Sequence, residues 1–164
     1  MTHSGPIGVR VRPATEDDAA LLLAWRNDPD VRGWSRSSEE IDPAAHAEWL
    51  RGTLARPDRH LLVVETDPDG VPVGSVRYDR LAEEGRWEVS ISVAADMRGR
   101  GVGGAVLRGA DDWLSAAEPG AVEIVAHVRP ANTGSRRLFE RNGYRATASA
   151  EPDMDCFVRR WQGR

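Results

Sequence analysis

Hydrophobic and polar residues alternate strictly along one stretch in the middle of the chain, from Arg86 to Val93. A period of two residues is typical of a strand with one buried face. We expect Trp87 on the buried face and Glu88 on the opposite, polar face. Shorter alternations and apolar runs between turn residues predict further strands at 9–12, 59–66, 71–81, 121–128, 144–148 and 154–161.

Other segments carry apolar residues at every third or fourth position, which is the period of a helix with one buried face. We predict helices at 15–27, 42–56, 102–117 and 133–142. In helix 42–56, His46 lies one position off the apolar stripe, which predicts a histidine on the helix surface. The predicted buried positions are Ala47, Leu50 and Leu54 in helix 42–56, and Val102, Val106, Ala110, Trp113 and Ala117 in helix 102–117.

The order of these elements predicts one α/β (α+β) domain. Three consecutive strands between 59 and 93 form an antiparallel meander, and helix 102–117 then crosses over to strand 121–128. Such a crossover places its two flanking strands parallel to each other. We therefore expect a mixed, mostly antiparallel sheet with one parallel pair and flanking helices. Residues 1–7 are predicted to be a flexible tail, and 8–164 the domain.

Composition narrows the class of protein. The 164 residues include 40% hydrophobic and 29% charged residues, which is ordinary for one globular domain. A net charge of −4 provides no basic surface for nucleic acid or anionic membranes, and we expect neither as a partner. No apolar run is long enough to span a bilayer, and the first residues lack the apolar core of a signal peptide, so we expect a cytoplasmic protein. The single cysteine, Cys156, excludes an internal disulfide and is expected to be a packed or half-exposed thiol.

A glycine-rich loop separates strand 86–93 from helix 102–117. It contains four glycines within seven residues, Arg98 to Gly104. Glycines permit close backbone approach and positive φ, and a helix start offers unpaired N–H groups. With Arg98, Arg100 and Arg108 nearby, the segment predicts a binding site for an anion, most simply a pyrophosphate.

Glycine loops of several chemistries compete for this stretch. A P-loop needs Lys and then Ser or Thr after its last glycine, and Ala105 stands there instead. A dinucleotide fingerprint is formally present at Gly99, Gly101 and Gly104, but too little chain follows for a second nucleotide-binding half. A glycine-rich turn without any ligand also stays open. The remaining pattern, Arg-x-x-Gly-x-Gly, is met by Arg98, Gly101 and Gly103.

That last pattern resembles the pyrophosphate loop of the GNAT superfamily of acetyl-CoA-dependent N-acetyltransferases. A second stretch, Asn132 to Tyr144, is similar to the family's Asn-x-x-Ser-x-x-Leu-Tyr-Glu-x-x-Gly-Phe helix. The two motifs and the order of elements extend the resemblance over nearly the whole chain. The resemblance implies a GNAT-like fold with acetyl-CoA in a splayed parallel pair of strands. The cofactor-binding residues that it implies are the backbone of Ile91, Ser92 and Val93, the loop Arg98, Gly99, Arg100, Gly101, Val102, Gly103 and Gly104, and Asn132 with Ser135.

The implied reaction is direct attack of an amine on the thioester. A base must take a proton from the amine, and both Glu88 and His127 suit this role. A backbone N–H at Val93 would bind the oxyanion. The family's tyrosine that protonates the leaving thiolate is replaced by Phe139, so water or Tyr78 would have to supply that proton, or the thiolate leaves unprotonated. Tyr144 is interpreted as a packing residue.

The N-terminal third is expected to hold the acceptor. Residues 22–32, with Trp34, His46 and Trp49, resemble acetyltransferases of UDP-linked 4-amino-sugars and, less fully, ribosomal-protein N-terminal acetyltransferases. Aromatic faces suit a sugar or base, and arginines suit phosphate or carboxylate, although both could simply pack or be solvated. The predicted acceptor-binding residues are Trp25, Arg26, Arg32, Trp34 and Tyr78, with Arg36 as a further cation.

The sequence therefore predicts transfer of an acetyl group to a primary amine of a small molecule, with a nucleotide-linked amino sugar as one candidate. A protein N-terminal acetyltransferase is an alternative. A non-catalytic acetyl-CoA-binding protein is another, which the replacement at Phe139 permits. No metal site is expected, and a homodimer remains open.

Overall fold

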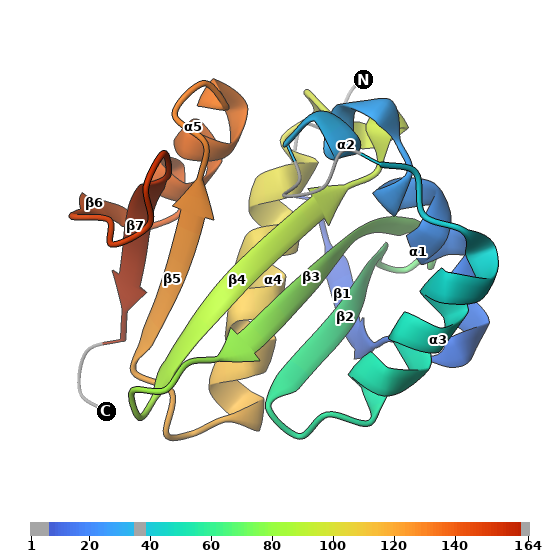
Figure 1. The fold of residues 1–164 in the computed structure, drawn as a ribbon, viewed down its shortest axis with the longest axis horizontal. Helices are drawn as coiled ribbons and strands as arrows, with labels where there is room; N and C mark the ends of the chain where they lie inside the picture. The colour runs from blue at the N-terminus through green and yellow to red at the C-terminus, as the bar shows by residue number, and fades with distance from the viewer. Residues whose placement is uncertain (1–6, 35–38, 162–164) are drawn as a thin grey trace.

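The protein is described by a computed structural model that covers residues 7–34 and 39–161. Its centre is a seven-stranded sheet with the strand order β1-β2-β3-β4-β5-β7-β6 (Figure 1). Every neighbouring pair is antiparallel except β4 and β5, which run parallel, as predicted. The strands are β1 (Val9–Pro13), β2 (Arg59–Thr66), β3 (Pro72–Arg80), β4 (Arg86–Val93), β5 (Glu123–Val128), β6 (Arg145–Thr147) and β7 (Asp155–Arg160).

Five α-helices and two short 3-10 turns accompany this sheet in the described part of the chain. Helix α4 has the bounds that its apolar period predicts. The short helix α2 was not predicted, because the residues around it are too polar to suggest a packed element. It begins at Pro29, where Asp28 accepts a hydrogen bond from the Asp30 amide at 2.9 Å. The helices are α1 (Ala19–Arg26), α2 (Pro29–Trp34), α3 (Pro43–Leu54), α4 (Val102–Ala117) and α5 (Thr133–Arg141), with turns η1 (Glu16–Asp18) and η2 (Ala95–Met97).

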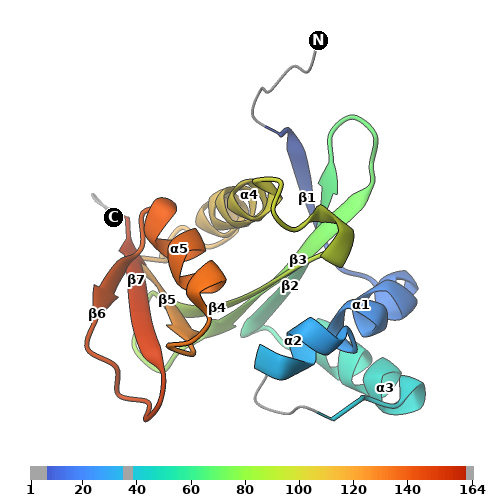
Figure 2. The same ribbon diagram turned by 90° about the horizontal axis from the view of Figure 1, so that it is seen from above.

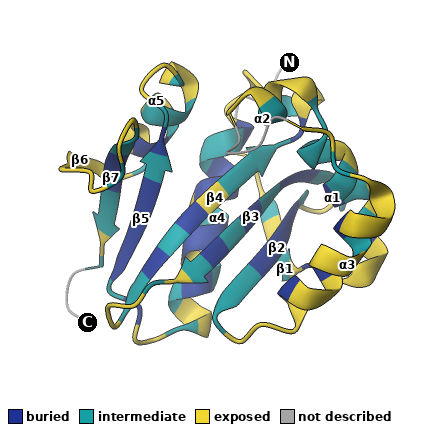
Figure 3. Ribbon diagram, in the orientation of Figure 1, coloured by how far each residue is buried: buried dark blue, intermediate teal, exposed yellow. Residues whose placement is uncertain are grey.

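The helices form two separate layers. Helices α4 and α5 lie on one face of the sheet, and α1, α2 and α3 lie on the other (Figure 2). The main core fills the α4–α5 face, where Val76, Trp87 and Val106 are fully or almost fully buried. A smaller core, which includes Leu22 and Leu50, lies under α1 and α3. Strand β2 has helices on both faces, so the four residues 61–64 are all buried (Figure 3).

The second helix layer covers only part of its face. Helices α1 and α3 pack on the β2 side, and no described helix lies over the polar face of β4 and β5. Glu88 and Ser90 of β4 therefore face an open space, whereas Trp87 and Val89 of the same strand are buried against α4. This uncovered polar face is the floor of the cleft described below.

The buried side of α4 differs from the predicted one and includes a carboxylate. Asp111 is completely buried and accepts hydrogen bonds from the hydroxyls of Tyr78 and Tyr144 and from Arg159. The helix turns Leu114 inward, while Trp113 is only half-buried and Ala117 is exposed. Tyr144 packs in the core as interpreted.

Tyr78 does not have the role predicted for it. Its side chain is completely buried on the α4 face of β3, and its hydroxyl is bound to Asp111. The prediction that Tyr78 binds the acceptor or protonates the thiolate is therefore wrong. Its alternation partner Arg77 points to the opposite face and lines the cleft instead.

The cysteine and the lengths of the helices are the next features to compare with the sequence. Cys156 is buried on β7, as one of the two expected states of this thiol. Within residues 7–34 and 39–161, none of the helices combines the length and apolar character needed to cross a bilayer. The predicted tail, residues 1–7, lies almost entirely outside the described residues.

The Asp111 network makes a prediction about stability. Asp111→Ala leaves two buried tyrosine hydroxyls and Arg159 without their shared acceptor, and such losses cost about 3 kcal/mol or more. We expect chemical denaturation to show a decrease of that size in the free energy of unfolding. Asp112→Ala, at the neighbouring exposed position, is the matched control and should change stability by less than about 0.5 kcal/mol. Equal effects of the two substitutions would contradict the assignment.

Candidate active site

The site begins where two parallel strands separate. Pairing between β4 and β5 holds for only three residue pairs, from Arg86 opposite Glu123 to Glu88 opposite Val125. Beyond them β4 continues to Val93 and β5 to Val128, and the two ends diverge (Figure 1). Among the described residues no strand occupies the gap between them, so one edge of β4 is left without a sheet partner.

The hydrogen-bond alternation of β4 shows which backbone groups face this gap. In an antiparallel ladder, successive residues point their N–H and C=O groups to opposite sides. The Ala94 amide donates to the Val73 carbonyl at 2.9 Å, and Val93 lies opposite Gly74. Val93 and Ile91 therefore direct their backbone groups toward the gap, whereas those of Ser92 point to β3.

This alternation corrects one expectation. The backbone of Ser92 is used within the sheet, so it is not available to a molecule in the gap. The Ser92 side chain lines the cleft instead, and its hydroxyl oxygen is buried with no hydrogen-bond partner among the described residues. A buried hydroxyl of this kind is costly unless a ligand or water satisfies it.

The glycine loop closes one end of the gap. Gly99 and Gly101 have φ values of +76° and +75°, which a residue with a side chain adopts only with strain, and Gly101 is the N-cap of α4. A side chain at Gly103 would press on Leu138 of α5, with a Cβ at 3.3 Å, so glycine lets α4 start close to α5. The free N–H groups of the first turn of α4 lie at this end of the gap.

Arg98 connects the loop to both sides of the cleft. Its Nε donates to the Val93 carbonyl at 3.2 Å, and its Nη1 donates to Asp30 of α2 at 3.1 Å. Asp28 lies 3.7 Å from the same nitrogen. The guanidinium is therefore partly neutralised by two carboxylates, while Arg100 is exposed on the loop.

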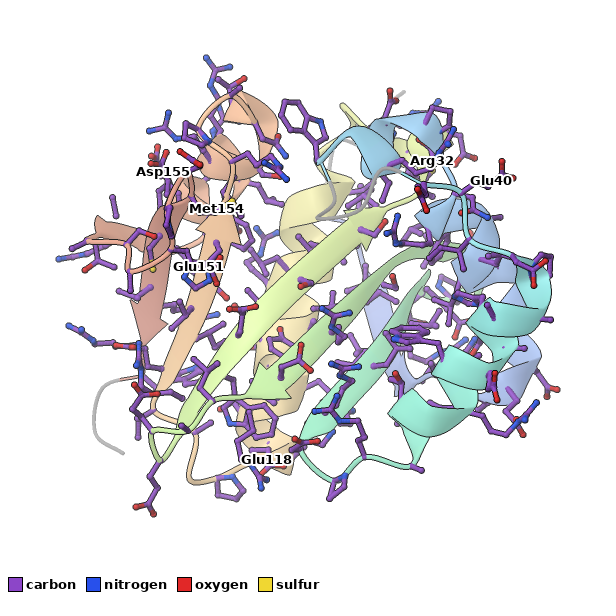
Figure 4. All side chains as sticks on the ribbon, viewed as in Figure 1. Arg32, Glu40, Glu118, Glu151, Met154 and Asp155 are labelled. Carbon is purple, nitrogen blue, oxygen red and sulfur yellow. The ribbon has the colours of Figure 1, made fainter. Side chains whose placement is uncertain are left out.

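A single large cleft contains most of the predicted site residues. Its volume is about 1310 Å³, and it runs from the gap across the open face of the sheet to α1, α2 and α3. Figure 4 shows Arg32 and Glu40 on one side of the open face of the sheet, and Glu151 and Met154 on the other. Of the predicted residues, those that line the cleft are Trp25, Arg26, Trp34, Glu88, Ile91, Ser92, Val93, Arg98, Gly99, Gly103, His127, Asn132 and Ser135.

The remaining predicted residues do not line it. Arg100 and Gly101 are exposed on the loop, and Val102 is buried and Gly104 half-buried at the start of α4. Arg32 is half-buried on α2, and its Nε is buried without a hydrogen-bond partner in the described chain. Arg36 lies outside the described residues.

The two candidate bases are in contact with each other. Glu88 of β4 and His127 of β5 project from the same face of the sheet, and His127 Nδ1 lies 2.9 Å from Glu88 Oε2. Both side chains are partly buried. Two residues that the sequence offered as alternatives thus form one hydrogen-bonded pair on the cleft floor.

His46 was missed as a site residue. The prediction of a surface histidine is wrong, because His46, Leu50 and Thr53 form the buried side of α3 and Leu54 is exposed. His46 lines the cleft beside Trp49, with 5.4 Å between the ring centroids. Burial, and next the charge of Arg26, lower its pKa, so the ring is neutral at pH 7. The exposure of Leu54 explains the error, since the predicted apolar stripe was drawn through a residue that faces outward.

Sequence comparison identifies this architecture. Residues 9–145 match the profile of the acetyltransferase (GNAT) domain. The chain belongs to the GNAT acetyltransferase family. As a member of this family it is an N-acetyltransferase, and acetyl-CoA is its acyl donor. A search of curated protein sequences finds no match.

Solved structures share the fold of this GNAT acetyltransferase. AAC(6')-Ib in complex with ribostamycin and coenzyme A superposes with a TM-score of 0.82 at 22% identity, covering 94% of each chain. The GNAT domain of S. lividans PAT gives 0.76 at 25% identity, over 93% of this chain and 90% of that one. A domain from Methanocaldococcus jannaschii gives 0.80 at 21% identity, over 95% and 100%.

The lowered pKa of His46 makes a prediction about acid stability. Above pH 6.5 the ring is neutral in both the folded and the unfolded chain, so it contributes no pH dependence. As pH falls through 6.5, the unfolded chain takes up a proton that the folded chain resists, and stability is lost. We expect His46→Gln to lose less stability than the wild type between pH 7.5 and pH 5.5, measured by denaturant unfolding. An equal loss in both proteins would contradict a buried neutral histidine.

Proposed function

We propose that this acetyltransferase acetylates a primary amine of a small molecule, by direct attack on acetyl-CoA bound between the separated ends of β4 and β5. The observation that carries the proposal is the Glu88–His127 pair, which lies on the cleft floor between that gap and the acceptor side. A base in this place meets an amine that enters from α1, α2 and α3. The volume of about 1310 Å³ exceeds that of most single-ligand pockets, as expected for a cleft that holds two substrates.

The residues of the gap fit the cofactor's pantetheine arm. This arm carries amides, and an extended chain with amides can add to a free strand edge. Ile91 and Val93 would pair with it through their backbone, and Ser92 would satisfy its hydroxyl there. Asn132 and Ser135 would contact it from the start of α5.

The pyrophosphate would lie at the glycine loop. There the first turn of α4 supplies free N–H groups from Val102, Gly103 and Gly104, and the helix dipole favours negative charge. Arg98 and Arg100 would add positive charge. The positive φ of Gly99 and Gly101 brings the loop backbone close to the ligand.

His127 is the better candidate for the base. When its Nδ1–H donates to the Glu88 carboxylate, the ring is oriented and Nε2 is left as the proton acceptor. His127 then takes a proton from the amine as the carbon–nitrogen bond forms and the carbon–sulfur bond breaks. The Val93 N–H, which faces the gap, donates to the carbonyl oxygen as negative charge develops on it.

The leaving thiolate must find its proton elsewhere. Phe139 stands where the family's tyrosine is expected, and it is buried with its ring centroid 5.0 Å from that of Tyr144. Tyr78 lies on the other face of the sheet. We therefore propose that water protonates the thiolate.

The acceptor side supports an amine that also carries a flat or sugar-like part and an anionic group. Trp25, Trp34 and Trp49 give it aromatic surfaces, and Arg26 and Arg77 give it positive charge. A nucleotide-linked amino sugar combines these properties. Ribostamycin, which is bound in one AAC(6')-Ib structure, has amino-sugar rings but no anionic group. The arginines of this cleft thus favour a different, anionic acceptor.

An amine panel with a free-thiol readout tests the substrate class. It should contain nucleotide-linked amino sugars, aminoglycosides, and peptides that begin with Ala or Ser. We expect turnover with small amines, and the highest kcat/KM with those that carry a phosphate. Turnover with the peptides alone would favour a protein N-terminal acetyltransferase. Acetyl-CoA binding without turnover of any amine would favour a non-catalytic binding protein.

Substitution of the paired residues tests the mechanism. General base catalysis contributes about 10²–10⁴-fold, so His127→Gln should lower kcat by about 100-fold or more. Glu88→Gln should lower kcat about 10-fold, because the amide can still bind the ring but carries no charge. Calorimetry should show unchanged coenzyme A binding in both variants, and Glu84→Gln, at an exposed position, is the control. A large loss in Glu88→Gln with a wild-type rate in His127→Gln would make Glu88 the base instead.

A further inference from the structure

A third ionisable side chain reaches the Glu88–His127 pair. Glu151 belongs to the loop between β6 and β7, and it is half-buried. One polar atom from each of the three side chains lies within 4.8 Å of the other two. Figure 4 shows Glu151 beside β5, on the same side of the sheet as Met154, which lines the cleft. The cluster thus unites three segments that are far apart in the sequence.

The loop holds Glu151 in place. Its amide donates a hydrogen bond to the Ser149 hydroxyl at 3.2 Å, and that hydroxyl donates to the Glu151 carbonyl at 3.0 Å. Met154, three residues on, lines the cleft. The loop therefore reaches the cleft again at Met154, after Glu151.

We infer that Glu151 is a positioning residue that acts through His127. It provides a second carboxylate near the imidazole. When His127 takes the proton of the amine, the positive charge that develops on the ring is stabilised by two carboxylates, those of Glu88 and Glu151. This inference rests on the proposed function.

Other groups near His127 do not replace this charge. Cys156 lies directly opposite His127 on β7, and burial raises the pKa of its thiol, so it stays neutral at pH 7. Two other charged residues line the cleft, Arg77 on β3 and Arg129 after β5. Two more, Arg86 on β4 and Glu123 on β5, act on the Cys156 thiol. Glu88 and Glu151 are therefore the two carboxylates that lie within 4.8 Å of the ring nitrogen among the described residues.

The split between kcat and KM tests the inference. Glu151→Gln keeps the shape and removes the charge, so the imidazolium that forms on proton transfer loses one of its two carboxylates. We expect kcat to fall about 3- to 10-fold with KM unchanged. Glu151→Asp keeps the charge and should restore most of the lost rate. Asp153→Asn removes the same charge from an exposed position in the same loop and should leave both quantities unchanged.

The outcomes separate this inference from the proposed function. A fall in kcat that Glu151→Asp does not restore would mean a structural role only, and wild-type kinetics in Glu151→Gln would mean no role. Either result overturns the inference while the large effect of His127→Gln still stands. A wild-type rate in His127→Gln would overturn both. Melting temperature and coenzyme A affinity, measured on each variant, identify a folding defect, and in that case the recovery of kcat in Glu151→Asp decides.

A metal ion at the same three side chains is the competing interpretation. Histidine and two carboxylates are suitable ligands for a divalent cation. If Glu151 instead acts as a positioning residue without any metal, prolonged EDTA treatment leaves the rate of the wild type unchanged, and this is the result that we expect. Loss of activity with EDTA and its recovery with Zn²⁺ would assign the cluster to a metal and contradict the role of Glu151 as a positioning residue.

Discussion

The short register between β4 and β5 is the constraint on which the rest of the structure depends. Three residue pairs join the strands, and then the sheet opens. Because Ser92 and Ala94 direct their backbone groups to β3, those of Ile91 and Val93 are directed into the opening. A longer register would close the sheet, remove the free strand edge, and separate the glycine loop from the face that carries Glu88 and His127.

The helix layers convert this opening into a site. Helices α4 and α5 pack on one face, and the large cleft lies on the other. There α1 and α3 pack on the β2 side and leave the polar face of β4 and β5 uncovered (Figure 2). Arg98 joins the two halves, since one guanidinium binds the end of β4 and the carboxylate of Asp30 on α2. A phosphate at the loop would compete with Asp30, which links the cofactor end of the cleft to the acceptor wall.

The sequence predicts the parts of this arrangement that local chemistry determines. The alternation in 86–93 and the glycines after it indicate a strand, an anion loop and a helix, and Asn132 caps α5 as expected. Both candidate bases could be named, since strand period alone places Glu88 on the polar face. Their pairing could not be named, because it depends on how β4 and β5 align across a crossover.

The errors have the same origin. Tyr78 alternates correctly for a strand residue, but the choice of face depends on Asp111 of α4, a buried carboxylate in an otherwise apolar stripe. His46 was placed outside because Leu54 looked buried and is not. Glu151 lies in a polar turn without any period, so only the folded chain brings it to His127. Contacts between segments that are far apart in the sequence determine each of these positions, and a local sequence pattern cannot predict such contacts.

A crystal structure with coenzyme A bound is the most direct test of the central claim. The account predicts that the pantetheine amides pair with the backbone of Ile91 and Val93 in the opening between β4 and β5, and that the pyrophosphate contacts the amides of the first turn of α4. A structure in which coenzyme A binds elsewhere, or in which β4 and β5 pair along their full length, would contradict it.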